Sequence, residues 1–436
     1  MASRSEWDAV SQRGWQICLG DATGPAKPVL LPDVTDEAAL KQPGPSEIKT
    51  QPIAHMHRCD ANHSIDVRSR TSLTCTATAG SEGRRRHDRT SPRSNSGSAQ
   101  LDPRRATLSV NSDIVVIDGC TPRIGSDRFL DQILDAGVSA VCVTVSAQIG
   151  AHMVGGLFQA IEEINVYYNL AEVRPDKCLV ATSTADIAAA KETGRLALIL
   201  TLQNCAPIEA DPVNLLPFLH RNGVKIAQLT YNERNRLGDG CFEPVDGGLT
   251  TIGRQAVREM NRLGILIDLS HVGLRTGLEA IEYSDKPCVF THTGCASLTE
   301  CLRNKPDDLI KNLADRGGII ALSPYSPFCQ KRPGQRPKLE DYLNHVDRAL
   351  ELVGDDHVAI GTDIAEHWAV RWFSNSGRRM PDLVAGYSWE TIYADGFDSL
   401  SCIPSVLDAL RQRGYTEETV RKLAGANWFR IFEETW

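Results

Sequence analysis

Two histidines that follow short apolar runs are the residues of this sequence best placed to bind a metal ion. The run Gly264–Leu269 leads to His271, and the run Cys288–Thr291 ends at His292. A helical pattern, Leu274–Tyr283, separates the two runs. Consecutive parallel strands of a β/α barrel present the residues at their C-terminal ends on one face. The spacing therefore predicts two converging imidazoles, which serve either as metal ligands or as buried structural histidines.

The elements that must position these histidines alternate regularly after Ser112. The expected buried strands are Ile114–Asp118, Val138–Val145, Leu196–Leu202, Val224–Leu229, Ile265–Leu269, Cys288–Thr291, Gly318–Leu322 and His357–Gly361. The expected helices include Asp127–Ala136, Gly156–Tyr168, Leu215–Asn222, Thr250–Leu263, Leu274–Tyr283, Asp307–Arg316 and Leu339–Val353. Eight strand–helix units predict an α/β fold, a (β/α)8 TIM barrel over residues 111–436. An open doubly wound sheet is the alternative, but no glycine-rich phosphate loop follows the first run.

The first 110 residues differ from the rest of the chain. Pro, Ser, Arg, Thr and Gly dominate them, and they lack apolar periodicity. Because such a segment buries too little surface to offset its chain entropy, residues 1–110 are predicted to be disordered. Its histidines and cysteine, His55, His57, Cys59 and His63, have no strand beneath them and are interpreted as unfolded chain rather than a metal site.

The overall composition is that of a soluble globular protein. The 436 residues are 42% hydrophobic and carry a formal net charge of -8, which favours no nucleic-acid partner. The 13 cysteines are scattered without metal-site or disulfide-framework spacing, which indicates reduced thiols and a cytoplasmic location. No apolar run is long enough to cross a bilayer, so no membrane insertion is expected.

The polar residues that follow the predicted strands are the site candidates, because active sites of such barrels lie at that end. They are Asp118, Cys120 and Pro122, then Gln203 and Asn204, Tyr231 and Asn232, His271, His292, Arg303, Ser323 and Tyr325, and Asp363. Two imidazoles and a carboxylate at one barrel mouth predict a hydrolytic metal site.

Several of these residues lie in stretches that resemble the renal (membrane) dipeptidase family of zinc peptidases. The most similar stretches are GLTTIGRQAVREMNRLGILIDLSHV, THTGCASLTECLRNKPDD and HVAIGTDI, and LTLQNCAPIEAD and LAGANWFRIF match less closely but in the expected order. The similarity runs from about Ile114 to Phe432. It implies a barrel with two zinc ions bridged by a glutamate and a hydroxide, a dipeptide or similar small-molecule substrate, and a homodimer.

Four positions match the functional residues of that family. The two histidines of its second zinc site match His271 and His292. Its general acid/base aspartate matches Asp363, and the arginine that grips the substrate carboxylate matches Arg303. By this resemblance, Asp363 is the catalytic residue and Arg303 binds the substrate.

The remaining positions depart from the family pattern. Its His-x-Asp pair, which binds the first zinc, falls on Cys120 and Pro122, its bridging glutamate on Gln203, and a substrate-binding histidine on Tyr231. Two divalent cations about 3.5–4 Å apart need anionic bridging, which a neutral amide and a proline do not supply. The first zinc site is therefore predicted to be empty, so the expectation is one zinc ion at most, or none.

Each of these residues has two interpretations. Gln203 and Cys120 are weak ligands of the ion held by the two histidines, or else a hydrogen-bonding replacement and a packed thiol. Asp363 and Arg303 act on the substrate or form a structural ion pair. Tyr231 binds substrate as an oxyanion donor or lines the pocket.

The sequence thus predicts a zinc-dependent, dipeptidase-like hydrolase of a dipeptide or similar small carboxylate-bearing amide. The alternative is a metal-poor homologue that binds a small ligand.

Overall fold

Parallel strands occupy the centre of the computed structural model, which describes residues 114–145, 156–365 and 384–436. The strands are β1 (Ile117–Thr121), β2 (Ala140–Thr144), β3 (Cys178–Val180), β4 (Leu196–Leu202), β5 (Val224–Gln228), β6 (Leu266–Asp268), β7 (Cys288–Thr293), β8 (Ile319–Leu322) and β9 (Val358–Ile360). Their order is β1-β2-β4-β5-β6-β7-β8-β9, and β3 pairs separately with β4. Every pairing is parallel.

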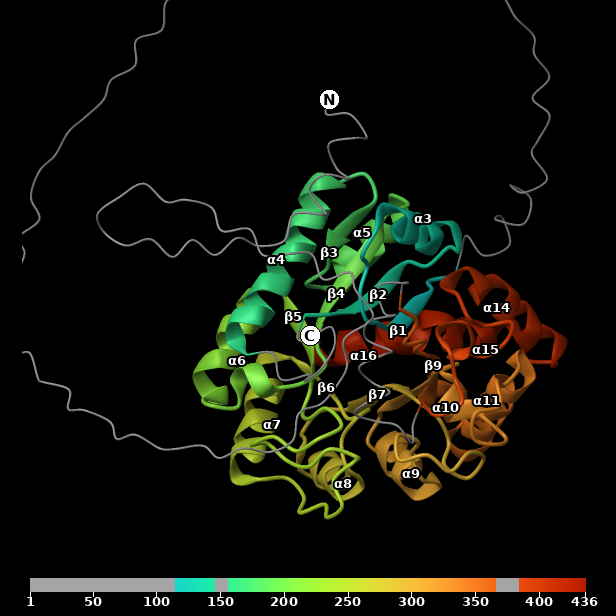
Figure 1. Ribbon diagram of the computed structural model, residues 1–436. Coiled ribbons are helices and arrows are strands. Elements are labelled where there is room, and N and C mark those ends of the chain that lie inside the picture. Colours follow the sequence, from blue (N-terminus) through green and yellow to red (C-terminus); the bar gives the residue numbers. More distant parts are fainter. Residues whose placement is uncertain (1–113, 146–155, 366–383) are drawn as a thin grey trace, which may run out of the picture. The chain divides into compact units, whose positions relative to one another are not determined.

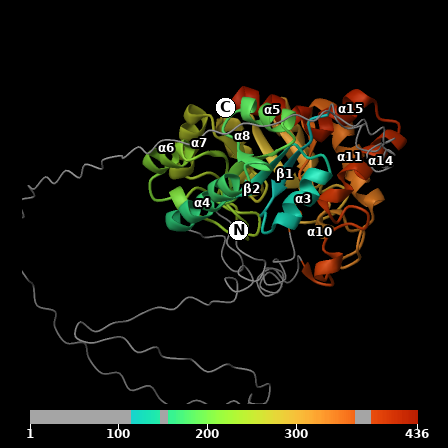
Figure 2. The same ribbon diagram turned by 90° about the horizontal axis from the view of Figure 1, so that it is seen from above.

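Helices surround these strands (Figures 1 and 2). They are α3 (Asp127–Asp135), α4 (Leu157–Val173), α5 (Thr184–Glu192), α6 (Pro212–Arg221), α7 (Thr251–Leu263), α8 (Leu274–Tyr283), α9 (Asp307–Asp315), α10 (Ser326–Cys329), α11 (Leu339–Val353), α14 (Ile403–Gln412), α15 (Glu417–Arg421) and α16 (Asn427–Thr435). In the described part of the chain, no helix is both long and apolar enough to span a membrane.

Alternation along each strand divides the apolar side chains between two cores. In β4, for example, Leu198 and Leu200 pack in the layer between strands and helices, whereas Ala197 and Ile199 pack inside the ring. Successive side chains of a strand point to opposite faces, so a strand that is buried on both faces reads as one unbroken apolar run. This is why the runs are visible in the sequence.

Hydrogen bonds to β1 join the first and last strands of the sheet. The carboxylate of Asp118 accepts from the backbone N–H of Thr362 at 2.6 Å and from its hydroxyl at 2.8 Å. The backbone N–H of Asp363 donates to the carbonyl of Cys120 at 2.8 Å. The sheet is thereby a nearly closed barrel.

Helix α16 covers the end of the barrel at which the strands begin. Trp428 and Phe432 are fully buried and pack with the side chains inside the ring. Arg430 donates to the carbonyls of Gly317 and Asp356, which precede β8 and β9. Because large side chains fill this end, the polar groups that remain inside the ring lie toward the opposite, C-terminal end of the strands.

The structure confirms the predicted (β/α)8 barrel and corrects some of its boundaries. Strand β1 begins at Ile117, not at Ile114, because pairing with β2 begins at Ile117. Cys120 consequently lies within β1 rather than after it. The short strand β3 was not predicted, since three residues show no periodicity. The predicted disordered segment, residues 1–110 with its histidines, lies outside the described residues.

Candidate active site

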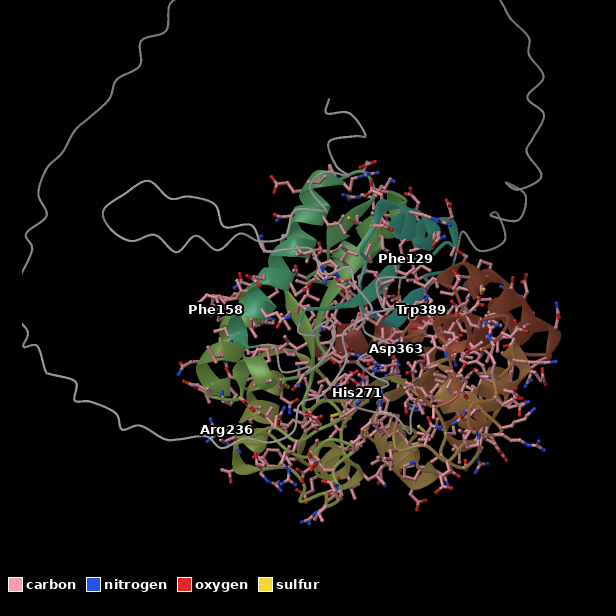
Figure 3. The ribbon with its side chains drawn as sticks, viewed as in Figure 1. Phe129, Phe158, Arg236, His271, Asp363 and Trp389 are labelled. Carbon is pink, nitrogen blue, oxygen red and sulfur yellow. The ribbon has the colours of Figure 1, made fainter. Side chains whose placement is uncertain are left out.

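His271 and His292 meet at the C-terminal end of the barrel. His271 follows β6 and His292 lies in β7, and their Nε2 atoms are 2.8 Å apart. Figure 3 shows both His271 and Asp363 near the middle of the ring of strands. Burial, and then the positive charge of Arg303, lowers the pKa of both imidazoles well below the ordinary value. Both are therefore neutral at pH 7, which is the form that binds metal ions.

Neighbouring side chains determine which nitrogen of each imidazole carries the hydrogen. His271 Nδ1 lies 2.6 Å from Asn232 Oδ1, an acceptor. His292 Nδ1 lies 2.8 Å from the hydroxyl of Thr291, whose own hydrogen goes to Asp268 at 2.7 Å. Both Nδ1 atoms therefore donate, which leaves a lone pair on each Nε2. Two lone pairs that face each other at 2.8 Å require a positively charged or hydrogen-donating group beside them.

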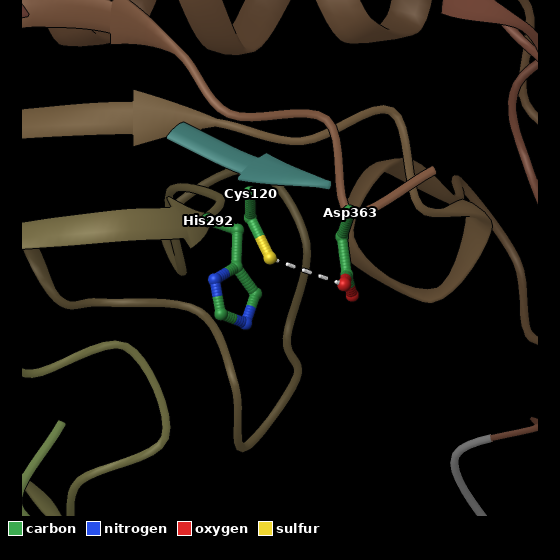
Figure 4. A group of neighbouring side chains, drawn as sticks. All are labelled: Cys120, His292 and Asp363. Carbon is green, nitrogen blue, oxygen red and sulfur yellow. Dashed lines mark hydrogen bonds between the residues drawn. The ribbon is translucent and has the colours of Figure 1, made fainter. Parts of the chain in front are cut away.

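Gln203, Cys120 and Asp363 border the same point. Gln203 Nε2 lies 3.2 Å from His292 Nε2 and 3.7 Å from Cys120 Sγ. The thiol of Cys120 donates to Asp363 Oδ1 at 3.5 Å (Figure 4). The ligand atoms of Cys120, His292 and Asp363 all lie within 4.8 Å of one another. Strands β1 and β7 and the segment after β9 thus bring a thiol, an imidazole and a carboxylate together.

The backbone of Asp363 is held in a left-handed conformation, with φ at 57°. Its N–H donates to Cys120, and its carbonyl accepts from the Tyr393 hydroxyl at 2.8 Å. Asp is one of the few residues besides Gly that adopt this conformation readily. Loss of solvation raises the pKa of the Asp363 carboxyl to about 7, although the charge of Arg303 opposes this shift. A carboxyl with such a pKa is suited to accept and return a proton near neutral pH.

Arg303 is buried next to the backbone of Ser270 and His292 and is only 1% exposed. Its guanidinium donates to the carbonyl of Ser270 and, at 3.3 Å, to that of His292. These two bonds connect the ends of β6 and β7. Among the described residues, Arg303 forms no ion pair with Asp363. A guanidinium carries five N–H groups, so donors remain for a substrate carboxylate.

We expect Arg303→Met to lower the free energy of unfolding by about 2–6 kcal/mol, because it leaves two buried carbonyls without donors at about 1–3 kcal/mol each. Denaturant titration measures the change. Arg275→Met is the matched control, since Arg275 is 63% exposed in its ion pair with Glu279, and such pairs contribute about 0–1 kcal/mol. Equal losses in the two variants would contradict the structural role of Arg303.

Two tyrosines border the histidines and Asp363. The ring of Tyr231 stacks on that of His271, with centroids 3.8 Å apart and an interplanar angle of 24°. Tyr325 packs edge-on against Tyr393, and its buried hydroxyl has no hydrogen-bond partner among the residues that the structure describes. A buried hydroxyl without a partner is costly, so a ligand that reaches Tyr325 would satisfy it.

The donor set fits one divalent ion and does not fit two. The facing lone pairs of His271 and His292 suit a cation such as zinc, for which neutral imidazole is an ordinary ligand. A second ion nearby would need anionic bridging, but Gln203 is neutral and Pro122 has no donor atom. The number of ions that the site binds stays a prediction.

The remaining site candidates have structural partners. The carboxylate of Asp118 binds Thr362, as described above. The side chain of Asn204 accepts from the N–H of Ala206 at 3.0 Å, and the hydroxyl of Ser323 donates to the carbonyl of Thr362 at 2.8 Å. Each of these three side chains holds neighbouring backbone in place.

Two residues that orient His292, Asp268 and Thr291, were not among the predicted site residues. Asp268 accepts from the backbone and the hydroxyl of Ser270 and of Thr291, and it thereby fixes the hydrogen bond to His292. The signal for it was a carboxylate inside an otherwise apolar run, Ile265–Leu269. A buried ionisable group in a strand needs such partners.

Comparisons with known proteins identify a matching family model, similar sequences and similar folds. The model of the membrane dipeptidase family, peptidase family M19, matches residues 123–386. Dipeptidase verJ of Clonostachys rogersoniana is 27% identical over 276 residues, which cover 63% of this chain and 64% of that protein. An uncharacterized dipeptidase of Schizosaccharomyces pombe is 29% identical, with 63% and 62% covered. The chain thus spans less than two thirds of the length of these relatives.

Solved structures show the same fold. An amidohydrolase from Pseudomonas aeruginosa is 30% identical, with a TM-score of 0.69, and the match covers 76% of this chain and 99% of that one. A metallopeptidase from Rhodobacter sphaeroides, bound to a phosphinate mimic of the dipeptide L-Ala-D-Ala, is 20% identical, with a TM-score of 0.61 and 74% and 99% covered. At the latter identity the likeness concerns the fold alone.

Proposed function

Because the chain belongs to the membrane dipeptidase family, we propose that it is a hydrolase that uses a single divalent metal ion, zinc by preference. Its substrate is a dipeptide or a similar small amide that bears a carboxylate. The observation that supports this proposal most directly is the pair of facing Nε2 lone pairs of His271 and His292, 2.8 Å apart. In this proposal the two histidines hold the ion, with Gln203 as a weaker ligand.

The chain's own residues supply the other parts of the reaction. When bound, a divalent ion supplies Lewis acidity that polarises a carbonyl and acidifies water. Asp363 accepts a proton from the attacking water and returns it to the leaving amine, for which a pKa of about 7 is suitable. Arg303 uses its remaining N–H groups to orient the substrate carboxylate. Tyr231, stacked on His271, borders the substrate.

A metal-free protein that binds a small ligand is the second candidate. One observation favours it: the Gln203 amide nitrogen lies within hydrogen-bonding distance of both His292 Nε2 and Cys120 Sγ. An amide group in this position offers hydrogens to both atoms without any ion. This arrangement would leave the carboxylate of Asp363 and the hydroxyl of Tyr325 for ligand binding.

Metal analysis combined with peptide hydrolysis separates the two candidates. The purified full chain is stripped with a chelator, equilibrated with zinc, and assayed on a panel of dipeptides. We expect about one zinc per chain and hydrolysis that disappears on chelation and returns with zinc. No bound zinc after equilibration, together with no hydrolysis of any dipeptide, would refute the hydrolase and favour the ligand-binding protein.

We expect Gln203→Glu to raise zinc affinity without creating a second tight site. The substitution adds an anionic oxygen beside His292, which strengthens binding of one cation. The first zinc site still lacks its ligands, because Pro122 has no donor atom. Calorimetric titration measures both the affinity and the number of sites. Two tight sites in this variant would contradict the account of the altered donors.

A further inference from the structure

Cys120 is the residue of the site whose presence the proposed reaction does not explain. It lies within β1 and is 4% exposed. Its sulfur is 3.5 Å from Asp363 Oδ1 and 3.7 Å from Gln203 Nε2. Figure 4 shows the thiol between the imidazole of His292 and the carboxylate of Asp363. A thiol that only fills space does not require three polar neighbours.

The Gln203 amide nitrogen lies where the lone pairs of His292 Nε2 and Cys120 Sγ converge. It is near His292 Nε2 at 3.2 Å and near Cys120 Sγ at 3.7 Å. On its other side, Gln203 Oε1 accepts from the hydroxyl of Thr144 at 3.4 Å. A hydroxyl can donate or accept, so the amide can turn and present its oxygen to the same point without losing its bond to Thr144. Nitrogen, sulfur and oxygen ligands are then available together.

The alternative roles of a reactive thiol do not fit this environment. Burial, and then the negative charge of Asp363, raises the pKa of the Cys120 thiol well above its usual value. Such a thiol is a poor nucleophile, because the thiolate is the reactive form. It also forms no disulfide in this structure. A neighbouring divalent ion is the partner that makes a buried thiolate favourable.

We propose that Cys120 and His292 are ligands of one and the same ion, so that a thiolate at Cys120 takes the place of the carboxylates the site lacks. This inference rests on the proposed function, in which the ion is held by His271 and His292. As the bond from sulfur to the ion forms, the S–H bond breaks. The proton passes to the Asp363 carboxylate, which already accepts that hydrogen bond, and then to solvent. The thiolate thereby lowers the net positive charge of the ion together with its ligands.

A thiolate changes which ions the site selects. Sulfur and imidazole ligands favour zinc, cobalt and cadmium, whereas magnesium, calcium and manganese prefer sites made of oxygen ligands. The chain is therefore expected to bind the first group tightly and the second weakly. A site made of carboxylates would discriminate less sharply between the two groups.

Cobalt reports directly on a bound thiolate. We would load the full chain with Co²⁺ and record its absorption in the near ultraviolet, where sulfur-to-cobalt charge transfer appears. The variants are Cys120→Ser and Cys120→Ala, of which the second avoids burying a new hydroxyl. Cys142→Ala is the control, since Cys142 is a buried cysteine of the neighbouring strand β2. Circular dichroism confirms that each variant is folded.

We expect the charge-transfer band in the unmodified chain and in Cys142→Ala, and its loss in both Cys120 variants with at least about 10-fold weaker binding. Tight cobalt binding without the band, or a band that survives in the Cys120 variants, would refute the thiolate and leave the histidine-held ion in place. Failure to bind either cobalt or zinc would refute this inference together with the proposed metal-dependent reaction.

Discussion

Asp363→Asn is expected to lower kcat by a factor of about 100 to 10,000, the usual contribution of a general acid–base group. Asparagine tolerates the left-handed backbone of this position as aspartate does. In the metal-free protein its side-chain oxygen still accepts the hydrogen bond from the Cys120 thiol. KM should therefore remain close to its original value. Metal affinity should fall, because a negative charge close to the ion is lost, so assays at saturating zinc isolate proton transfer. Steady-state kinetics with a dipeptide measures it.

The pH profile gives a second readout of the same residue. Asp363 acts as a base only when it is deprotonated, so kcat should rise with pH through about 7 and fall below it. Positive charge from a bound ion lowers this pKa, which places the acidic limb at or below about 7. The Asp363→Asn variant should lose this acidic limb of the kcat profile. Asp408→Asn, at an exposed position on α14, is the control. A fall in kcat of less than tenfold in Asp363→Asn would contradict the role of the carboxyl.

His292→Gln is expected to abolish tight zinc binding and to lower turnover by about a thousandfold or more. The Lewis acidity of the ion contributes several kcal/mol to such reactions, and each 1.36 kcal/mol is about tenfold in rate. His292 is the residue on which the other donors converge, since it contacts His271, Gln203 and Thr291. Glutamine keeps most of the volume, so the fold should persist. Calorimetry and hydrolysis assays measure the two losses.

A histidine at the other end of the barrel is the matched control. His357 precedes β9 and bonds to the carbonyl of Gly318 at 2.7 Å. We expect His357→Gln to bind zinc as the unmodified chain does. Retained zinc affinity in His292→Gln, or an equal loss in both variants, would contradict the proposed metal site.

Much of the barrel could be predicted from the sequence because its strands are buried on both faces. Runs such as Leu196–Leu202 and helices such as Leu339–Val353 match the structure at both ends. The convergence of His271, His292 and Asp363 also follows from strand ends that share one face. The roles of these residues are still predictions, as are zinc, the homodimer and the cytoplasmic location.

Other features depend on contacts between residues that are distant in the chain. The position of Cys120 inside β1 follows from pairing with β2, which an apolar run does not reveal. Arg303 appears in the sequence as a loop residue, and only the folded chain shows that it is buried against two carbonyls. The hydrogen-bond chain from Asp268 through Thr291 to His292 crosses two strands, so no local pattern could predict it.

An anomalous diffraction measurement at the zinc edge, on crystals of the full chain equilibrated with zinc, shows whether the barrel binds one ion, two or none. We expect a single peak at the C-terminal end of the barrel, in contact with His271 and His292, and none at a second position. Two peaks would show that the altered residues still support a pair of ions. An empty map at full equilibration would show that the facing imidazoles serve some purpose other than metal binding.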